Sequence, residues 1–255
     1  MRFASLGSGS RGNSLIVEAG ATRVLLDCGF STRTMIERLA RLSVTPDQID
    51  AILVTHEHGD HVAGVFKFSS RFGIPVYLTS GTCIAAVRGK APSSEIHLID
   101  SHGVFSIGGL EIQPFPVPHD AREPVQFVLS NGSLSLGVLT DTGVITQHVI
   151  DKLGCCNALV LECNHDLKLL AESSYPEVLK RRISGSFGHL DNQQAASLLQ
   201  KIETRQLQHI VAAHLSEQNN HPELVVSALA SVLNCSEDWI GVASQEYGFG
   251  WRQLF

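Results

Sequence analysis

The chain has 255 residues, of which 44% are hydrophobic and 17% charged, and its formal net charge is −6. This composition can fill a large core, and the lack of any apolar run of about 18 residues argues against a membrane span or a disordered chain. The N-terminal residues lack the basic and apolar regions of a signal peptide, so we expect a cytoplasmic protein.

Cysteine and histidine counts limit the function further. The six cysteines form no C-x-x-C pair, which argues against a disulfide framework and against a structural zinc knuckle. The twelve histidines are many for an acidic chain, and histidine is the commonest metal-ligand type. The positions of the histidines are therefore the first place to look for a functional site.

A glycine-rich segment, "GSGSRG" at residues 7–12, follows the first apolar run. It matches the dinucleotide motif G-x-G-x-x-G, and Asp27 stands where such a motif would place a ribose-binding carboxylate. That motif requires a helix after its last glycine. Residues 14–18 and 24–27 are instead short, partly β-branched runs, which predict strands. We therefore expect a turn between two strands and no nucleotide cofactor.

The later elements alternate between helices and strands. Helices are predicted at residues 34–42, 62–71, 80–88, 176–183, 192–202 and 222–233. Strands are predicted at residues 51–55, 74–78, 110–117, 125–130, 134–140, 158–162, 208–213, 239–243 and 248–254. This order predicts an α/β fold with helices packed on two central sheets. No linker or repeat divides the chain, so we expect one domain over residues 1–255.

The strongest chemical signal is "THEHGDH", residues 55–61, at the end of the strand predicted at 51–55. His56, His58, Asp60 and His61 place four potential metal ligands in one loop. Imidazole and carboxylate ligands lie about 2.0–2.2 Å from a metal, and side chains so close in sequence point in different directions. Two adjacent ions, each bound by a pair, fit the segment better than a single ion does. The alternative is a solvated polar loop.

This segment resembles the signature of the metallo-β-lactamase superfamily, a four-layer αββα fold with a two-metal site between its sheets. The other landmarks of that superfamily follow in order, as "LLDCG" at 25–29, "VPHD" at 117–120, "LTDTG" at 139–143 and "AHLS" at 213–216. The resemblance implies two ligand sets and a bridging carboxylate: His56, His58 and His119 for one metal, Asp60, His61 and His214 for the other, and Asp141 between them. It also implies that Asp27 orients the signature loop.

Finer details favour one branch of the superfamily. Di-iron oxidoreductases carry glutamate where this chain has His58, which argues against redox chemistry. "VPHDAREP" at 117–124 differs from the "GHTxG" of lactamases and thioesterases, which favours phosphodiesterases and nucleases. The segments "GSGSRGNS", "LECNHD", "YPEVLKRRISGSFGHLDN" and "AHLSEQNN" resemble the bacterial YycJ/WalJ (VicX) family. That resemblance implies a 5′-to-3′ DNA exonuclease.

The implied mechanism is phosphodiester hydrolysis by a hydroxide shared between two divalent ions, with Asp60 in the catalytic set. Such ions lower the pKa of bound water toward about 7 and can clamp a phosphate, and Zn²⁺, Mn²⁺ and Fe²⁺ all suit His and Asp ligands. His189 in "FGHLDN" matches the position that serves as proton donor in related tRNA 3′-processing endonucleases, which implies that it donates a proton to the leaving oxygen. Glu162 and His165 would support it by hydrogen bonds. A purely structural role for each of these three residues stays open.

Substrate contacts are predicted around the glycine-rich loop and the third landmark. They are Ser8, Ser10, Arg11, Asn13 and Arg122, the last being either a phosphate contact or an ordinary ion pair. The basic run at 180–182 is better explained as a solvated helix end.

The acidity of the chain counts against DNA, because nucleic-acid binders usually have a basic footprint. We expect a DNA nuclease, with three alternatives. These are a hydrolase of a small cyclic or nucleotide-like phosphodiester, a thioester hydrolase, and a non-catalytic metal-binding regulatory protein.

Overall fold

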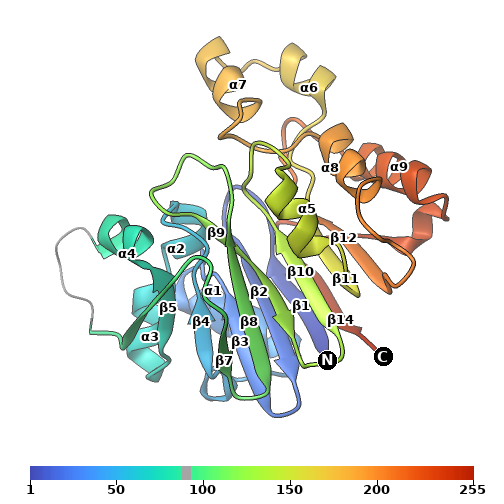
Figure 1. Cartoon of the computed structure of the whole chain (residues 1–255). Helices are drawn as coiled ribbons and strands as arrows, with labels where there is room; N and C mark the ends of the chain where they lie inside the picture. Colours follow the sequence, from blue (N-terminus) through green and yellow to red (C-terminus); the bar gives the residue numbers. More distant parts are fainter. Residues whose placement is uncertain (88–92) are drawn as a thin grey trace.

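Two seven-stranded sheets form the centre of the computed structural model, which describes residues 1–87 and 93–255 (Figure 1). The first sheet has the order β14 (Phe249–Gln253), β1 (Arg2–Gly7), β2 (Ser14–Ala19), β3 (Thr22–Leu26), β4 (Ala51–Leu53), β5 (Val76–Thr79), β6 (Ile96–Ile99). The second has the order β13 (Ile240–Val242), β12 (His209–Ala213), β11 (Ala158–Glu162), β10 (Ser135–Leu139), β9 (Val125–Ser130), β8 (Leu110–Pro116), β7 (Phe105–Ile107).

Each sheet is antiparallel in one half and parallel in the other. Strands β14 and β1 to β3 pair antiparallel, and β3 to β6 pair parallel. In the second sheet, β7 to β10 pair antiparallel and β10 to β13 pair parallel. Strands that are buried on both faces read as continuous apolar runs, as "ALVLE" of β11 does. Parallel neighbours in a sheet need a crossover connection, and helices supply most of these connections in this chain.

Helices cover the outer face of each sheet. On the first sheet, α1 (Thr32–Arg41) and α3 (Val65–Phe72) bury Met35, Leu39 and Phe68. On the second, α5 (Gln147–Leu153), α8 (Asn192–Leu199) and α9 (Pro222–Leu233) pack over β10 to β13. The prediction of a four-layer αββα fold is confirmed.

The inner faces of the sheets share one apolar core. Phe3 and Leu53 of the first sheet lie in one cluster with Phe127 and Val160 of the second. Fully burying a side chain of this kind stabilises the fold by about 1.5–3 kcal/mol. The core fixes the two sheets against each other, and so fixes the loops at their shared edge.

Several predicted boundaries differ from the structure. The helix predicted at 62–71 is divided into α2 (Gly59–Val62) and α3, with Gly64 between them. A Cβ at Gly64 would collide with the backbone oxygens of Phe30 and Cys28, so the chain turns there instead of continuing one helix. The helix predicted at 80–88 is α4 (Ser80–Val87), and Arg88 lies outside the described residues.

Some elements were missing from the prediction. They are β6, β7, α5, α6 (Leu167–Glu172) and the short 3-10 helices η1 (Pro46–Gln48) and η2 (Glu237–Trp239). The helix α7 (Glu177–Ile183) was predicted, and it lies with α6 beyond the strand ends, at the top of Figure 1.

The two ends of the chain meet in the first sheet, because β14 pairs with β1. The single domain over residues 1–255 stays a prediction that this pairing favours. Within the described ranges, no helix combines the length and apolar character needed to cross a membrane.

Candidate metal centre

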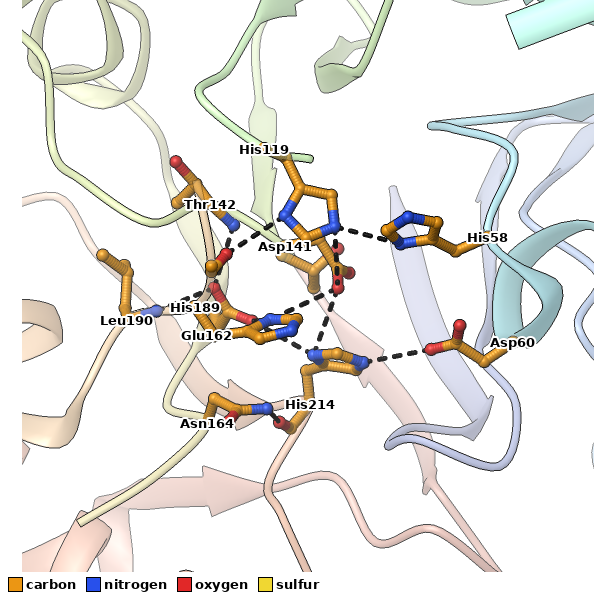
Figure 2. A network of polar contacts seen from close by, with 12 residues as sticks. His58, Asp60, His119, Asp141, Thr142, Glu162, Asn164, His189, Leu190 and His214 are labelled. Atoms are coloured by element: carbon orange, nitrogen blue, oxygen red, sulfur yellow. Dashed lines mark hydrogen bonds and ion pairs between the residues drawn. The ribbon is translucent and has the colours of Figure 1, made fainter. Parts of the chain in front are cut away.

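Polar loops from both sheets converge at one edge of the molecule. Loops that follow β3, β4, β8, β10 and β12 carry Asp27, the signature segment 55–61, His119, Asp141 and His214, and β11 ends at Glu162. Ligand atoms from these loops lie within 4.8 Å of one another in several groups of three or four. Figure 2 shows the side chains pointing toward one common space.

Three histidines form what we call the imidazole group: His56, His58 and His119. The Nδ1 of His119 lies 3.0 Å from the Gly188 carbonyl oxygen, to which it donates, and its Nε2 lies 3.2 Å from Nδ1 of His58. The Nε2 of His56 is buried and has no hydrogen-bond partner among the described residues. Burial lowers the pKa of His56 well below its usual range, and that of His119 as well, which favours neutral rings. Neutral rings offer lone pairs to a cation.

Asp60, His61 and His214 form a second set, the carboxylate group. The Oδ2 of Asp60 lies 3.3 Å from Nε2 of His61 and 3.3 Å from Nε2 of His214. Burial alone would lower the pKa of His61, but the charges of Asp141, Asp60 and Asp27 raise it well above its usual range. The space thus holds an excess of negative charge.

Asp141 lies between the two groups. Its Oδ2 is 3.1 Å from Nε2 of His61, and its Oδ1 is 3.9 Å from Nε2 of His119. The contact with His61 does not have the geometry of a hydrogen bond, so Oδ2 is buried without a hydrogen bond to any described residue. An unpartnered carboxylate oxygen, an unpartnered imidazole nitrogen and excess negative charge are what a site for divalent cations requires. The residues present therefore fit divalent metal ions.

Asp27 binds the signature loop through both oxygens of its carboxylate. Its Oδ1 accepts from the Thr55 amide at 2.8 Å, and its Oδ2 accepts from the Thr55 hydroxyl at 2.8 Å and from Nδ1 of His61 at 2.7 Å. With Nδ1 donating to Asp27, His61 presents Nε2 to the site. Both carboxylate oxygens of Asp27 contact the signature segment, as expected of a residue that orients this loop.

Backbone strain collects at the same place. Among the described residues, five other than glycine have positive φ, and three of them are Asp27 (61°), Asp141 (50°) and His214 (55°). The other two, Ser43 and Asn234, follow the ends of α1 and α9, where a left-handed residue is common. Each such residue costs on the order of 1–3 kcal/mol and persists only where surrounding contacts enforce it.

Glu162 joins two histidines. Its Oε1 accepts from Nδ1 of His189 at 2.8 Å and from Nδ1 of His214 at 3.1 Å. Its Oε2 accepts from the amides of Thr142 at 3.0 Å and Leu190 at 3.2 Å (Figure 2). Burial raises the pKa of Glu162, but the positive charge and hydrogen bonds of the histidines lower it to about 2. An ionised Glu162 therefore orients both rings.

The glycine-rich loop joins β1 to β2, as predicted. Gly9 and Gly12 have φ of 144° and 148°, and a Cβ on Gly12 would collide with the Phe30 ring. Ser8 and Asn13 are buried: the Ser8 hydroxyl accepts from the His214 amide at 2.8 Å.

The side-chain amide of Asn13 donates from Nδ2 to Oδ2 of Asp60 at 3.1 Å. These two loop residues hold proposed ligands and do not face solvent, unlike the substrate contacts that were predicted. Ser10 and Arg11 are exposed, and Arg11 pairs with Glu217 at 2.7 Å.

Two other predicted residues lie apart from the ligand cluster. The Arg122 side chain is exposed, and its amide donates to Oε1 of Glu57 at 2.8 Å. His165 is buried, and neither ring nitrogen has a hydrogen-bond partner among the described residues. The structure thus does not provide the predicted hydrogen bond from His165 to His189.

The basic run at 180–182 has two structural contacts. Lys180 donates to the Ala171 carbonyl at 2.7 Å and so ties α7 to α6. Arg182 pairs with Asp120 at 2.6 Å. Arg181 is exposed, as expected for a solvated helix end.

Sequence reasoning gave no role to four groups at the site: Thr55, Asp120, Thr142 and the Gly188 carbonyl. Thr55 and Asp120 stand beside predicted ligands in "THEHGDH" and "VPHD", so adjacency was a usable signal. A backbone carbonyl leaves no such signal.

Two facing sheets with helices outside them and a His/Asp cluster at their shared edge define a protein of the metallo-β-lactamase class. Residues 22–210 match the family model described as "Beta-lactamase superfamily domain". The chain is 32% identical over 257 residues to exodeoxyribonuclease YycJ of Bacillus anthracis, with 100% of this chain and 93% of that protein covered. It is 31% identical over 250 residues to exodeoxyribonuclease WalJ of Streptococcus pneumoniae strain D39, with 96% and 93% covered.

The fold has a matching solved structure. The metallo-β-lactamase fold protein YhfI of Bacillus subtilis superposes with a TM-score of 0.75 at 15% identity, with 97% of each chain covered. The chain therefore belongs to the YycJ/WalJ family of the metallo-β-lactamase superfamily.

Proposed function

We propose that the chain is a metal-dependent hydrolase of phosphodiester bonds that acts as a 5′-to-3′ DNA exonuclease. The observation that carries this proposal is the pair of ligand groups beside Asp141, in a chain whose full-length relatives are named exodeoxyribonucleases. The cytoplasmic location remains a prediction.

Two divalent ions complete the site in this proposal. His56, His58 and His119 would hold one, the carboxylate group would hold the other, and Asp141, which lies between the groups, would serve both. When bound, such ions supply activated water at neutral pH and positive charge against the phosphate. The donor set suits Zn²⁺, Mn²⁺ and Fe²⁺.

His189 is the residue that we propose as proton donor to the leaving oxygen. Its Nδ1 is fixed by Glu162, so Nε2 is the nitrogen free to hold that proton. The ring lies 5.3 Å from the rings of His119 and His214, centroid to centroid, and its side chain is 20% exposed. It is thus close to the ligands and accessible to substrate, as a general acid must be.

The net charge of −6 favours a second candidate, a small phosphodiester substrate. Cationic side chains nevertheless lie around the site: Arg11, Arg122, Arg181 and Arg182 are exposed. Nucleic acid binding depends on such local charge more than on the total.

The test compares substrates on purified protein whose metal content is known from elemental analysis. Turnover of 5′-labelled duplex DNA, single-stranded DNA, RNA, a chromogenic phosphodiester and a thioester is measured with Mn²⁺, with Zn²⁺ and with a chelator. We expect metal-dependent DNA cleavage that is lost in Asp60→Ala and kept in the exposed control Asp151→Ala.

Other outcomes separate the alternatives. Cleavage of the chromogenic ester alone favours a small phosphodiester as substrate, and thioester turnover alone overturns the proposal. A folded, metal-loaded protein that cleaves nothing indicates a binding protein.

A further inference from the structure

Phe187, Gly188 and His189, between α7 and α8, contact residues of the proposed metal centre, and the Phe187 side chain is exposed to solvent. The Gly188 carbonyl accepts from His119, and the His189 ring donates to Glu162. The Phe187 carbonyl accepts from the Asp120 amide at 3.0 Å, yet Phe187 itself is 62% exposed.

The backbone around Phe187 is held firmly. The amide of Gly188 donates to Gly185 at 2.8 Å, and that of His189 donates to Ile183 at 2.8 Å. A Cβ on Gly143 would collide with the backbone of Ser186, so this loop packs directly against the loop that carries Asp141. An exposed phenylalanine side chain thus stands on a well-held backbone segment beside the site, and it belongs to no core cluster of the described residues.

Arginines stand on the segments next to Phe187 and Asp120 in the chain. Arg182 pairs with Asp120, the residue that Phe187 binds, and its side chain remains 57% exposed. Arg181 on α7 and Arg122 in the turn after Asp120 are exposed as well. Proteins that bind single-stranded nucleic acid combine cationic side chains along the backbone with aromatic rings on which bases stack.

We propose that Phe187 is a substrate-positioning residue on which a base of an unpaired DNA end stacks while the adjoining phosphate lies at the metal centre. This inference rests on the proposed function and adds to it a preference for ends whose terminal base is free of its partner. The arginines at 122, 181 and 182 would contact the phosphates on either side of that base.

The experiment measures KM and kcat on 5′-labelled single strands that carry either a normal base or an abasic site next to the first scissile phosphate. Phe187→Ala removes the ring, Phe187→Trp restores an aromatic face, and Phe187→Leu keeps apolar bulk without one. Phe255→Ala is the matched control, because Phe255 is 89% exposed at the end of the chain. Thermal unfolding verifies that each variant is folded.

We expect Phe187→Ala to raise KM for the normal strand at least about 5-fold, the lower end of what one stacked base contributes, with kcat within about 2-fold. KM for the abasic strand should not change, the Trp variant should recover, and the Leu and Phe255 variants should resemble Ala and wild type respectively. Equal KM values for wild type and Phe187→Ala, or equal losses on both strands, would overturn the inference alone. A wild-type protein that cleaves no DNA would overturn the proposed function and this inference together.

Discussion

The two proposed ligand groups differ in what holds them in place. The imidazole group is held by neutral groups: the carbonyls of Gly188 and Asp120 hold His119 and His58, and the Thr55 hydroxyl holds His56. The carboxylate group is held by the buried carboxylates of Asp27 and Glu162. An imidazole that donates to a carboxylate is a more basic ligand than one that donates to a carbonyl. We therefore expect the carboxylate group to bind its ion more tightly, so that a chelator empties the imidazole group first.

Asp141→Asn should break both groups at once, because Asp141 lies between them. The variant loses one negative charge at the point where both ions would sit, so we expect kcat on DNA to fall by on the order of 10³-fold. Elemental analysis should find fewer than two ions per chain. Asp151→Asn, on the exposed face of α5, is the control. Wild-type metal content and turnover in Asp141→Asn would show that the groups do not depend on this carboxylate.

His189→Ala should separate proton donation from metal binding. His189 belongs to neither ligand group: its Nδ1 donates to Glu162 and lies 3.5 Å from Oδ1 of Asp141, so both ions should remain while kcat falls about 10²–10⁴-fold. The measurement pairs kcat with metal content, and adds a substrate whose leaving group needs no proton, such as a p-nitrophenyl ester. The loss should be much smaller on that substrate. An equal loss on both substrates would assign His189 a structural role.

Asp27→Asn should weaken one group and spare the other. The Asn side-chain oxygen can still accept from the Thr55 backbone amide, but an NH2 group replaces the oxygen that accepts from the Thr55 hydroxyl and from His61, so affinity at the carboxylate group should fall about 10- to 100-fold. Calorimetric titration of metal-free protein should then show one weakened step and one unchanged step. Two equally weakened steps would mean that the groups fold as one unit, and the comparison between them would fail.

Features with a local signal could be predicted from the sequence, and features that depend on contacts between distant loops could not. The strand at 125–130 and the ligand loop at 55–61 were visible because β-branched runs and clustered histidines are local signals. The sequence predicts Ser8 and Asn13 as substrate contacts, since polar residues in a glycine-rich turn are usually exposed. Their burial follows from loops distant in the sequence: Ser8 binds His214, 206 residues away, and Asn13 binds Asp60, 47 residues away. No local pattern contains that information.

Short helices escaped prediction for a related reason. The helix α5 has seven residues, and its start is fixed by the Thr146 side chain, which accepts from the Val149 amide. The equally short α7 follows Pro176, a helix-start signal that α5 lacks. The position of Phe187 was likewise invisible, because its exposure depends on contacts made by its neighbours Gly188 and His189.

Glu18→Gln serves as a test of a carboxylate that is remote from both ligand groups, and we expect it to change stability and not metal binding. Glu18 of β2 binds Arg2 of β1 and Arg23 of β3 across the strands. Burial raises the pKa of Glu18, but the hydrogen bonds and charges of the two arginines bring it below its ordinary value of 4.5. The unfolded chain thus binds its proton at higher pH than the folded chain does. The stabilisation is therefore complete above about pH 4.5 and is lost as the pH falls through the lower, folded value.

Urea unfolding of wild type and Glu18→Gln should differ by less than about 1 kcal/mol at pH 7, as expected for a pair near the surface. The difference should shrink as the pH falls below the ordinary pKa, while DNA cleavage at pH 7 is the same in both proteins. If the variant instead lost metal or activity, a charge far from the site would influence metal binding by the ligand groups. The contrast between the imidazole and carboxylate groups could then no longer be assigned to their immediate hydrogen-bond partners.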